Sequence, residues 1–502
     1  MQEQTPLEQA AWLTEVTGNN FLLKREDLQP VFSFKLRGAY NKMTGLTQKQ
    51  RDKGVICSSA GNHAQGVALA AQKLGCKAVI CMPVTTPEIK LEAVRRLGGH
   101  VKLIGETYSE TQTYAQEAAR QEERVFVPPY DDPFTIAGQG TIGTEILRQL
   151  TTLQLDNLHA IFVPVGGGGL IAGIAAYVKA LQPDVKVIGV EPSGANAMAI
   201  SLHRGQRVTL SKVDAFADGV AVKQVGAETF RLCQQLVDGV VLVDNRAISA
   251  AIKDVFNETR SILEPAGAVA VAGAKAYLKQ HNVKDKTVVV VTSGANMNFD
   301  RLRLVSELAD IGGLREAMLA TSIPESPGSF RAFIDTALSD TSQSVTEFKY
   351  RYSAGEQAHI LFSVGIKDAS ELSSLMQRLN DRNMPTQDLS SIEAAQVHLR
   401  HLVGGRARSY MGELPHEVIY QVEFPERPGA LKKFLSVLQP QWNITLFHYR
   451  RSGNRTSQAL LGLQLPPSEQ QGFDQVIQEL EADFQFTTLP EDARRVFDMF
   501  IQ

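Results

Sequence analysis

The feature that most constrains the fold is a regular alternation of short apolar runs with longer segments of helical pattern, between about residues 20 and 306. The apolar runs are rich in β-branched residues, as in 160–165, 185–190 and 287–291. Strands that alternate with helices along a chain favour parallel sheets with helices on both faces. Ligands of such sheets bind beyond the carboxyl ends of the strands. The sequence therefore predicts an α/β fold whose site lies in the loops after the strands.

Near residue 311 this pattern gives way to an internal repeat. Two pairs of segments match in order and at similar spacing: 325–333 with 426–434, and 345–351 with 444–450. Each copy is typical of a strand, a Pro-Gly turn, a helix and a second strand with alternating aromatic residues. We expect two small α+β modules of one ancestry, separated by the loop around 404–406.

Length and composition restrict the class of protein. A chain of 502 residues that is 43% hydrophobic can build several cores, which excludes a disordered chain. A net charge of −3 without a dense Lys/Arg tract argues against nucleic acid as a partner. Proline and glycine interrupt the longest uncharged stretch, 160–178, so we expect no membrane partner.

The chain start and the cysteines indicate the compartment. The first residues have neither the basic start nor the apolar core of a secretory signal. The four cysteines follow no metal-ligand spacing, so we predict no metal site. Without a secretory context they are expected to be reduced thiols. We therefore expect a cytoplasmic protein.

Two motifs together suggest pyridoxal phosphate. Lys35 lies in the motif SFKLRGA, and the glycine run Gly166–Gly169 follows an apolar stretch. A lysine amine can form a Schiff base, and backbone without side chains lets N–H groups converge on phosphate oxygens. Each motif alone is weak evidence for the cofactor. A single lysine, for example, is usually a surface charge.

A third motif, SSAGNHAQG at 58–66, follows a short apolar run and precedes an alanine-rich helical segment. A small-residue turn at the start of a helix offers free N–H groups and the positive end of the helix dipole, where a carboxylate binds. A turn that simply caps an ordinary helix is the alternative. The predicted substrate-binding residues are those of this turn: Ser59, Ala60, Gly61, Asn62 and His63.

These motifs, together with SGAN at 293–296 and the repeats, resemble the fold-type-II pyridoxal phosphate enzymes, which have the tryptophan synthase β-like fold. Within them, the chain closely resembles the biosynthetic threonine ammonia-lyases, or threonine deaminases, over nearly its whole length. The resemblance implies a catalytic domain at 1–318 and two ACT-like regulatory modules at 319–395 and 414–490. We also expect that a leading segment common in that family is lacking, because the chain starts a few residues before Thr5.

The resemblance implies a role for each residue. Lys35 holds the cofactor and, once threonine displaces it, removes the Cα proton; a desolvated amine has the lowered pKa that this work needs. Asn62 bonds the ring hydroxyl oxygen, and Ser293 faces the ring nitrogen. A neutral hydroxyl cannot keep that nitrogen protonated as a carboxylate would, so concerted loss of the β-hydroxyl is favoured. The cofactor phosphate binds at Gly166, Gly167, Gly168, Gly169 and Leu170.

The implied reaction is β-elimination of water from L-threonine, which gives 2-oxobutanoate and ammonia in the first step of isoleucine biosynthesis. Threonine and serine differ by one methyl group, worth about 1–3 kcal/mol in an apolar pocket, so L-serine should react more slowly.

The resemblance further implies a homotetramer that isoleucine inhibits, with valine as the opposing effector. Aromatic strand ends in the two repeats are the candidates for the effector site: Phe348, Tyr350, Phe447 and Tyr449. Their alternative interpretation is as ordinary core aromatics.

Three other functions are open from the residues. Residues 167–172 fit the G-x-G-x-x-A fingerprint of dinucleotide binding, with Glu191 about 20 residues later. A serine dehydratase or an amino-acid racemase of the same fold is a second alternative, although Ala60 stands where racemases carry a serine. Racemases also bind a divalent cation near the position of Asp218, where Lys212 replaces an acidic partner. A non-catalytic amino-acid sensor is the third alternative.

The segment 264–267 remains undecided. It matches a region near the cofactor in the family, but it also reads as an ordinary loop and helix cap. We therefore do not count it among the site residues.

Overall fold

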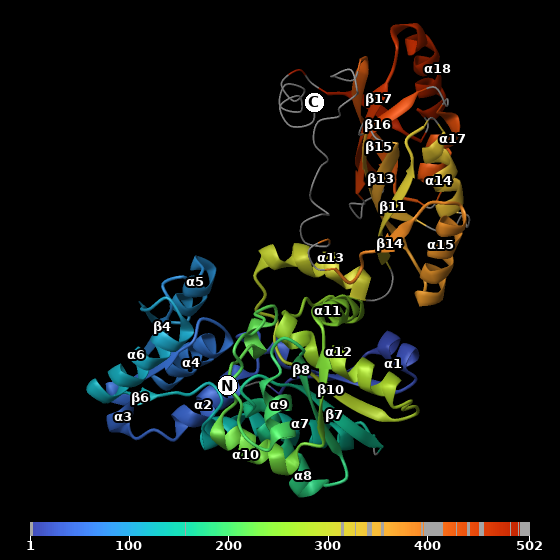
Figure 1. The fold of residues 1–502 in the computed structure, drawn as a ribbon. Coiled ribbons are helices and arrows are strands. Elements are labelled where there is room, and N and C mark those ends of the chain that lie inside the picture. The colour runs from blue at the N-terminus through green and yellow to red at the C-terminus, as the bar shows by residue number, and fades with distance from the viewer. Residues whose placement is uncertain are drawn as a thin grey trace. The chain divides into compact units, whose positions relative to one another are not determined.

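The computed structural model describes residues 4–155, 157–312, 316–326, 328–338, 344–352, 356–392, 395, 415–427, 429–438, 442–450, 456–481, 483–489 and 491. The chain divides into two compact units, Met1–Gly312 and Gly313–Gln502, and each is described by itself (Figure 1). The predicted loop around 404–406 lies outside the described residues. None of the helices in the described part of the chain has the length and apolar character to span a bilayer.

The larger sheet of the first unit has six strands in the order β1-β2-β10-β7-β8-β9. All neighbours are parallel except β1, which runs antiparallel to β2 at the edge. The strands are β1 (Leu7–Gln9), β2 (Asn20–Arg25), β7 (Leu158–Pro164), β8 (Lys186–Pro192), β9 (Gly239–Val243) and β10 (Thr287–Thr292).

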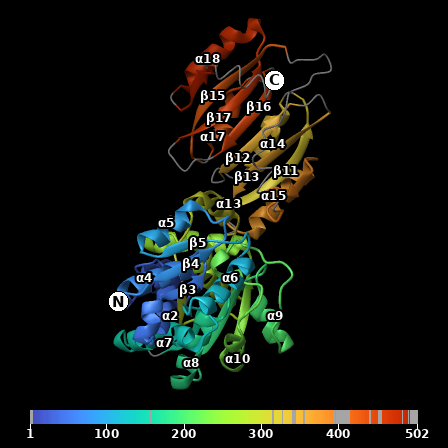
Figure 2. The same cartoon turned by 90° about the vertical axis from the view of Figure 1, so that its left-hand side faces the viewer.

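The second sheet of this unit is all parallel, in the order β5-β4-β3-β6 (Figure 2). Its strands are β3 (Val55–Ser58), β4 (Ala78–Met82), β5 (His100–Leu103) and β6 (Val125–Phe126). The predicted parallel α/β fold is confirmed.

Helices cover both faces of these sheets. They are α1 (Ala11–Thr17), α2 (Lys35–Thr44), α3 (Gln48–Lys53), α4 (Asn62–Leu74), α5 (Glu88–Arg96), α6 (Tyr108–Gln121), α7 (Pro133–Thr152), α8 (Gly169–Leu181), α9 (Ala197–Arg204), α10 (Ala227–Leu236), α11 (Asn245–Thr259), α12 (Pro265–Gln280) and α13 (Leu302–Gly312), with short 3-10 turns η1 (Glu26–Leu28), η2 (Asp218–Val220) and η3 (Phe299–Arg301). Val288 and Val290 of β10 pack in one core and Val289 and Val291 in another. Burial on both faces explains why this strand is a continuous apolar run.

The second unit is one antiparallel sheet in the order β14-β11-β13-β12-β16-β17-β15-β18, with helices on one face (Figure 1). The elements are β11 (Glu316–Pro324), α14 (Ser329–Ala337), β12 (Val345–Arg351), β13 (Gln357–Gly365), α15 (Ala369–Asp381), β14 (Thr386–Asp388), β15 (Glu417–Pro425), α17 (Ala430–Val437), β16 (Asn443–Arg450), β17 (Thr456–Gln464), η5 (Pro467–Glu469), α18 (Gln470–Leu480) and β18 (Gln485–Thr488).

The strand order reads the same from either end once the two repeats are matched, so the repeats form two α+β modules joined through β12 and β16. In that pair Phe348 faces Tyr449 and Tyr350 faces Phe447. These are equivalent pairs of repeat positions, which places a local pseudo-twofold axis between Lys349 and His448. The predicted pair of α+β modules is confirmed, while the exact bounds 1–318, 319–395 and 414–490 stay predictions.

Candidate active site

Lys35 is the first residue of α2, and the chain just before it is tied to the loop after β10. The N–H of Phe34 donates to the carbonyl oxygen of Ser293 at 3.2 Å, and Ser33 forms a β-bridge with Gly294. Lys35 Nζ donates to the carbonyl oxygen of Pro129 at 3.3 Å. Burial lowers the pKa of Lys35 to about 8, opposed by the charge of Glu264. A fraction of this amine is therefore neutral near pH 7, as a base or nucleophile requires.

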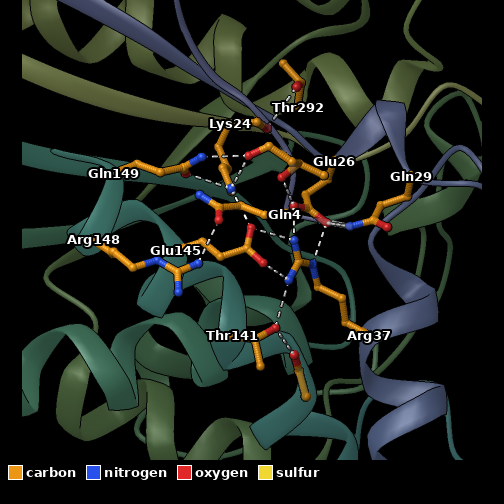
Figure 3. Close-up of polar contacts among 12 residues, drawn as sticks. Gln4, Lys24, Glu26, Gln29, Arg37, Thr141, Glu145, Arg148, Gln149 and Thr292 are labelled. Atoms are coloured by element: carbon orange, nitrogen blue, oxygen red, sulfur yellow. Dashed lines mark hydrogen bonds and ion pairs between the residues drawn. The ribbon is translucent and has the colours of Figure 1, made fainter. Parts of the chain in front are cut away.

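A buried ion-pair network fixes the first turn of α2 (Figure 3). Arg37 donates to both carboxylate oxygens of Glu26 at 2.7 and 2.8 Å and to both of Glu145 at 2.7 and 2.8 Å. Its remaining N–H donates to Thr141 Oγ1 at 3.0 Å, so all five donors are used. Lys24 Nζ binds the same Glu145 carboxylate at 2.6 Å. Two cations and two carboxylates thus balance one another inside the protein.

Asn62 begins α4 and belongs to a chain of three polar side chains. Its Nδ2 donates to Glu264 Oε1 at 2.6 Å, and Asn296 Nδ2 donates to Asn62 Oδ1 at 2.6 Å. Burial and the nearby charge of Asp218 raise the pKa of Glu264 to about 7. Glu264 is not among the site residues predicted from the sequence. The signal that identifies it is structural, since its side chain does not cap α12 although it stands at the cap position.

The rest of the predicted substrate turn leads into α4 without a side-chain cap. Ser59 Oγ accepts from the N–H of Gly61 at 3.2 Å, and Ala60 is half-buried. His63 points inward, with Nε2 2.9 Å from the carbonyl oxygen of Val127. Burial and the charge of Lys35 lower its pKa to about 3, so this imidazole is neutral at physiological pH.

The turn lies beside the lysine because α4 packs against the start of α2. A Cβ on Gly66 would lie 3.1 Å from the carbonyl carbon of Lys35 and 3.1 Å from the amide nitrogen of Leu36. A side chain at residue 66 would therefore push the two helices apart. The uncapped N-terminus of α4 and the Lys35 amine are thus parts of one site.

The glycine run Gly166–Gly169 forms a tight loop between β7 and α8. Gly168 has φ +94°, and a Cβ on Gly167 would lie 2.3 Å from the Tyr130 ring. Thr229 Oγ1 donates to the carbonyl oxygen of Gly167 at 2.7 Å. The N–H groups of Gly167 and Gly168 meet no acceptor among the described residues.

This loop fits a phosphate group. No side chain caps α8, and the backbone has room only for glycine at this point, so N–H groups and a helix dipole face the same anion position. Leu170 contributes backbone only, because its side chain lies in the apolar core.

Ser293 lies at the carboxyl end of β10, next to the lysine. It is 4% exposed, and its Oγ is 3.4 Å from the carbonyl oxygen of Ala266. A buried, neutral hydroxyl with one long contact is free to bond a ring nitrogen. The structure thus brings together Lys35 at the start of α2 and three loops that follow strands, those that hold Asn62, the glycine run and Ser293.

Glu191 was considered for dinucleotide binding and Asp218 for cation binding, and both carboxylates contact other groups of the protein. Glu191 accepts from the N–H groups of Met198 and Ala199 at 2.9 and 2.8 Å, so its carboxyl caps α9. Asp218 Oδ2 lies 3.1 Å from Lys90 Nζ and Asp218 Oδ1 3.6 Å from Arg301 Nη1. Within the described ranges no group of three potential metal ligands occurs, and the absence of a metal site stays a prediction.

Comparison with known proteins decides the family. Residues 1–294 match the pyridoxal-phosphate dependent enzymes, and residues 307–399 and 408–496 match the C-terminal regulatory domain of threonine dehydratase. The chain is 56% identical over 489 residues to "Threonine dehydratase 1 biosynthetic, chloroplastic" of Solanum lycopersicum, covering 97% of this chain and 79% of that protein. It is 49% identical over 501 residues to "L-threonine dehydratase biosynthetic IlvA" of Burkholderia multivorans, covering 99% and 96%. The chain belongs to the threonine dehydratase family of pyridoxal phosphate enzymes.

Two solved structures are similar to this chain in fold and in sequence. The processed threonine deaminase isoform 2 of Solanum lycopersicum is 57% identical with a TM-score of 0.60, and the match covers 62% of this chain and 84% of that one. Maize serine racemase is 31% identical with a TM-score of 0.57, covering 61% and 92%. Pyridoxal phosphate is the cofactor of this family, so the interpretation of 167–172 as a dinucleotide site is wrong. Membership of an enzyme family likewise excludes the non-catalytic sensor.

The four aromatic residues predicted for the effector site are neighbours on the paired strands β12 and β16, and all four belong to one hydrophobic core. Phe348 and Phe447 are core residues whose ring centroids lie 5.5 Å apart, and Tyr449 packs on Phe424 at 5.6 Å. Tyr350 differs from the other three residues. Its hydroxyl donates to the Glu325 carboxylate at 2.8 Å, and its side chain lines a cavity between the two modules. Only Tyr350 of the four candidates lines this cavity.

Proposed function

We propose that this chain catalyses the pyridoxal phosphate-dependent deamination of L-threonine to 2-oxobutanoate and ammonia, the first step of isoleucine biosynthesis. The observation that carries the proposal is the convergence of the Lys35 amine, the Asn62–Glu264 pair and the uncapped glycine loop in a chain that matches biosynthetic threonine dehydratases over nearly its whole length.

The bound cofactor supplies an electron-withdrawing group conjugated with the substrate Cα, which stabilises the negative charge left when the Cα proton departs. Lys35 Nζ, with its pKa lowered to about 8, takes that proton. The uncapped N-terminus of α4, beside Lys35, binds the substrate carboxylate. Lys35 therefore faces a substrate held in one orientation.

The other residues set the electrostatics of the site. Asn62 is held at both ends by Glu264 and Asn296, so its amide is oriented before the cofactor ring binds. Ser293 would place a neutral hydroxyl at the ring nitrogen of the bound cofactor, and a hydroxyl stabilises a charge on that nitrogen less than a carboxylate would. Loss of the β-hydroxyl together with the Cα proton is the reaction that suits this arrangement.

The test is a pair of progress curves of 2-oxo acid formation from L-threonine and L-serine. We expect both to react, with threonine favoured by about tenfold in kcat/KM because of its methyl group. Conversion of L-serine to D-serine, measured by chiral chromatography, with no release of 2-oxo acid would contradict the proposal and favour the racemase alternative.

Isoleucine is the proposed inhibitor and valine the opposing effector, and we assign the effector site to the cavity at Tyr350. Its lining combines Glu325 and Arg331 with the apolar side chains of Ile323, Leu435 and Ile444. A carboxylate and a guanidinium suit the two charged groups of an amino acid, and the apolar residues suit an aliphatic side chain. This composition supports a branched-chain amino acid as ligand.

We also propose a homotetramer in the cytoplasm, as the family resemblance implies. The four cysteines are unpaired, which supports a reducing compartment. Light scattering of the purified chain would measure the mass of the assembly directly.

A further inference from the structure

One short segment, 129–132, contacts several parts of the candidate active site. The carbonyl oxygen of Pro129 accepts from Lys35 Nζ at 3.3 Å. The Tyr130 ring lies against Gly167 of the glycine loop. The Asp132 carboxylate caps α7 and binds Lys42 of α2 at 2.7 Å. Asp131 lies between them and contacts neither the lysine nor the loop.

The Asp131 carboxylate caps α10, a helix distant in sequence. Oδ2 accepts from the N–H of Ala227 at 2.9 Å, and Oδ1 accepts from those of Glu228 and Thr229 at 2.9 and 3.4 Å. A Cβ on Gly226 would lie 2.4 Å from Oδ1, so the helix approaches the carboxylate as closely as glycine permits. The free donors and the positive end of this helix are used by a side chain of the protein itself.

Thr229 transmits this contact to the glycine loop. It is fully buried in the first turn of α10, and its Oγ1 donates to the carbonyl oxygen of Gly167 at 2.7 Å. The N–H of Gly226 donates to the same oxygen at 3.3 Å. In a trans peptide the C=O and the following N–H point in opposite directions, so the N–H of Gly168 must point away from Thr229.

We infer that Asp131 is a positioning residue for the phosphate-binding loop. It holds α10 in place, α10 holds the Gly167 carbonyl through Thr229, and this contact aims the Gly168 N–H at the cofactor phosphate. The inference rests on the proposed function only in taking pyridoxal phosphate as the cofactor. If charge alone mattered, the negative Asp131 side chain near an anion site would weaken phosphate binding, and its neutralisation would strengthen it.

The cofactor is removed from each variant, and the affinity of the resulting apoenzyme is measured for pyridoxal phosphate and for pyridoxal, which lacks the phosphate. Asp131→Asn should weaken pyridoxal phosphate binding by about tenfold, the value of one charge-assisted hydrogen bond, and leave pyridoxal binding within about twofold of wild type. Thr229→Val should behave similarly, and Thr229→Ser, which keeps the hydroxyl, should restore most of the affinity. The loss in the double variant should be smaller than the product of the two single losses, because both act through one contact.

Controls separate this inference from general destabilisation and from the proposed function. Asp244→Asn removes the matched cap of α11, where Oδ1 accepts from the N–H of Ala247 at 2.8 Å, and should leave both affinities unchanged. Unchanged or tighter binding of pyridoxal phosphate by Asp131→Asn, or equal losses for both ligands, would overturn the inference. If Asp131→Asn does not fold, the comparison of Thr229→Val with Thr229→Ser decides. Failure of the wild-type chain to bind pyridoxal phosphate would instead refute the proposed function.

Discussion

At the scale of single residues, the site depends on groups whose protonation the protein shifts. Burial lowers the pKa of Lys35 to about 8 and raises that of Glu264 to about 7. Because Lys35 and Glu264 also attract one another, neither shift is as large as burial alone would make it. Both groups therefore change charge near the pH at which the enzyme works.

The lowered pKa of Lys35 predicts the pH dependence of cofactor attachment. Only the neutral amine attacks an aldehyde, so the rate of covalent attachment to apoenzyme should rise with pH and level off near about pH 8. An exposed lysine would level off near about pH 10.4. Stopped-flow absorbance measures this rate. A rate still rising steeply above pH 9 would contradict the assigned environment of Lys35.

Ser293 is tested by a substitution that changes only the ring-nitrogen partner. Ser293→Asp should stabilise a charge-delocalised species, visible as long-wavelength absorbance during turnover, and should slow elimination. Ser293→Ala serves as the control, because it removes the hydroxyl without adding charge. Wild-type spectra and rates in the aspartate variant would show that residue 293 does not face the ring.

Some site residues were predictable from the sequence and others were not. Lys35, Asn62 and the glycine run stand in compact motifs, and the structure places Asn62 and the glycine run after strands β3 and β7, as the sequence predicted. Glu264 was not assigned because a glutamate before proline at a helix start reads as a cap. Its contact with Asn62 spans 202 positions in the chain, which no local pattern encodes.

At the scale of secondary-structure elements, α2 carries Lys35 and depends on Arg37. The guanidinium is fully buried and bonded to Glu26 and Glu145, which lie on η1 and α7. Burial of these charges costs desolvation energy, so the network contributes geometry more than stability. The position of the catalytic lysine is thereby tied to three separate elements.

Although the intact network adds little net stability, removing Arg37 alone should be costly, because it leaves buried carboxylates without their partner. Arg37→Met leaves two buried carboxylates with Lys24 alone, and we expect a loss of about 3–5 kcal/mol in the free energy of unfolding. Arg231→Met breaks the exposed pair with Glu228 on α10 and should cost under about 1 kcal/mol. Denaturant unfolding of the full chain measures both. Equal losses in the two variants would contradict the structural role given to the network.

The helices and strands were predictable from the sequence where a periodic pattern of residues determines them. Alternation of β-branched runs and helical segments predicted the parallel sheets, and the repeat predicted the modules. The segment 129–132 has no such pattern, and its contact with α10 joins residues 96 or more positions apart. Its contribution was therefore visible only in the structure.

At the scale of the whole molecule, the chain combines a catalytic unit with a doubled regulatory unit. A ligand changes activity only if it binds active and inactive states with different affinities. The cavity at Tyr350 is lined by residues of both modules, so a ligand there can respond to their relative arrangement.

Tyr350→Phe removes one hydroxyl from this cavity and its bond to Glu325. We expect isoleucine inhibition to weaken by about tenfold, with kcat for threonine unchanged, because a hydrogen bond to a charged group is lost. Tyr420→Phe, on β15 outside the cavity, is the matched control. Undiminished inhibition in the Tyr350 variant would move the effector site elsewhere.

A chain that ends at Gly312 tests whether the first unit carries catalysis and the second unit carries regulation. Gly312 is the last residue of the first compact unit and precedes β11, so this cut leaves the first unit whole. If this fragment folds, it should keep threonine elimination and lose its response to isoleucine. Retained inhibition would contradict a regulatory role for the second unit.

The central claim is that Lys35 and its bound cofactor eliminate water from threonine. The most direct test measures 2-oxobutanoate and ammonia released from L-threonine by the wild-type chain and by Lys35→Ala, each reconstituted with pyridoxal phosphate. We expect wild type to release 2-oxobutanoate and ammonia in equal amounts, and Lys35→Ala to release neither product and to hold no covalently bound cofactor. Ordinary turnover by Lys35→Ala, or a wild-type chain that releases no 2-oxobutanoate, would contradict it.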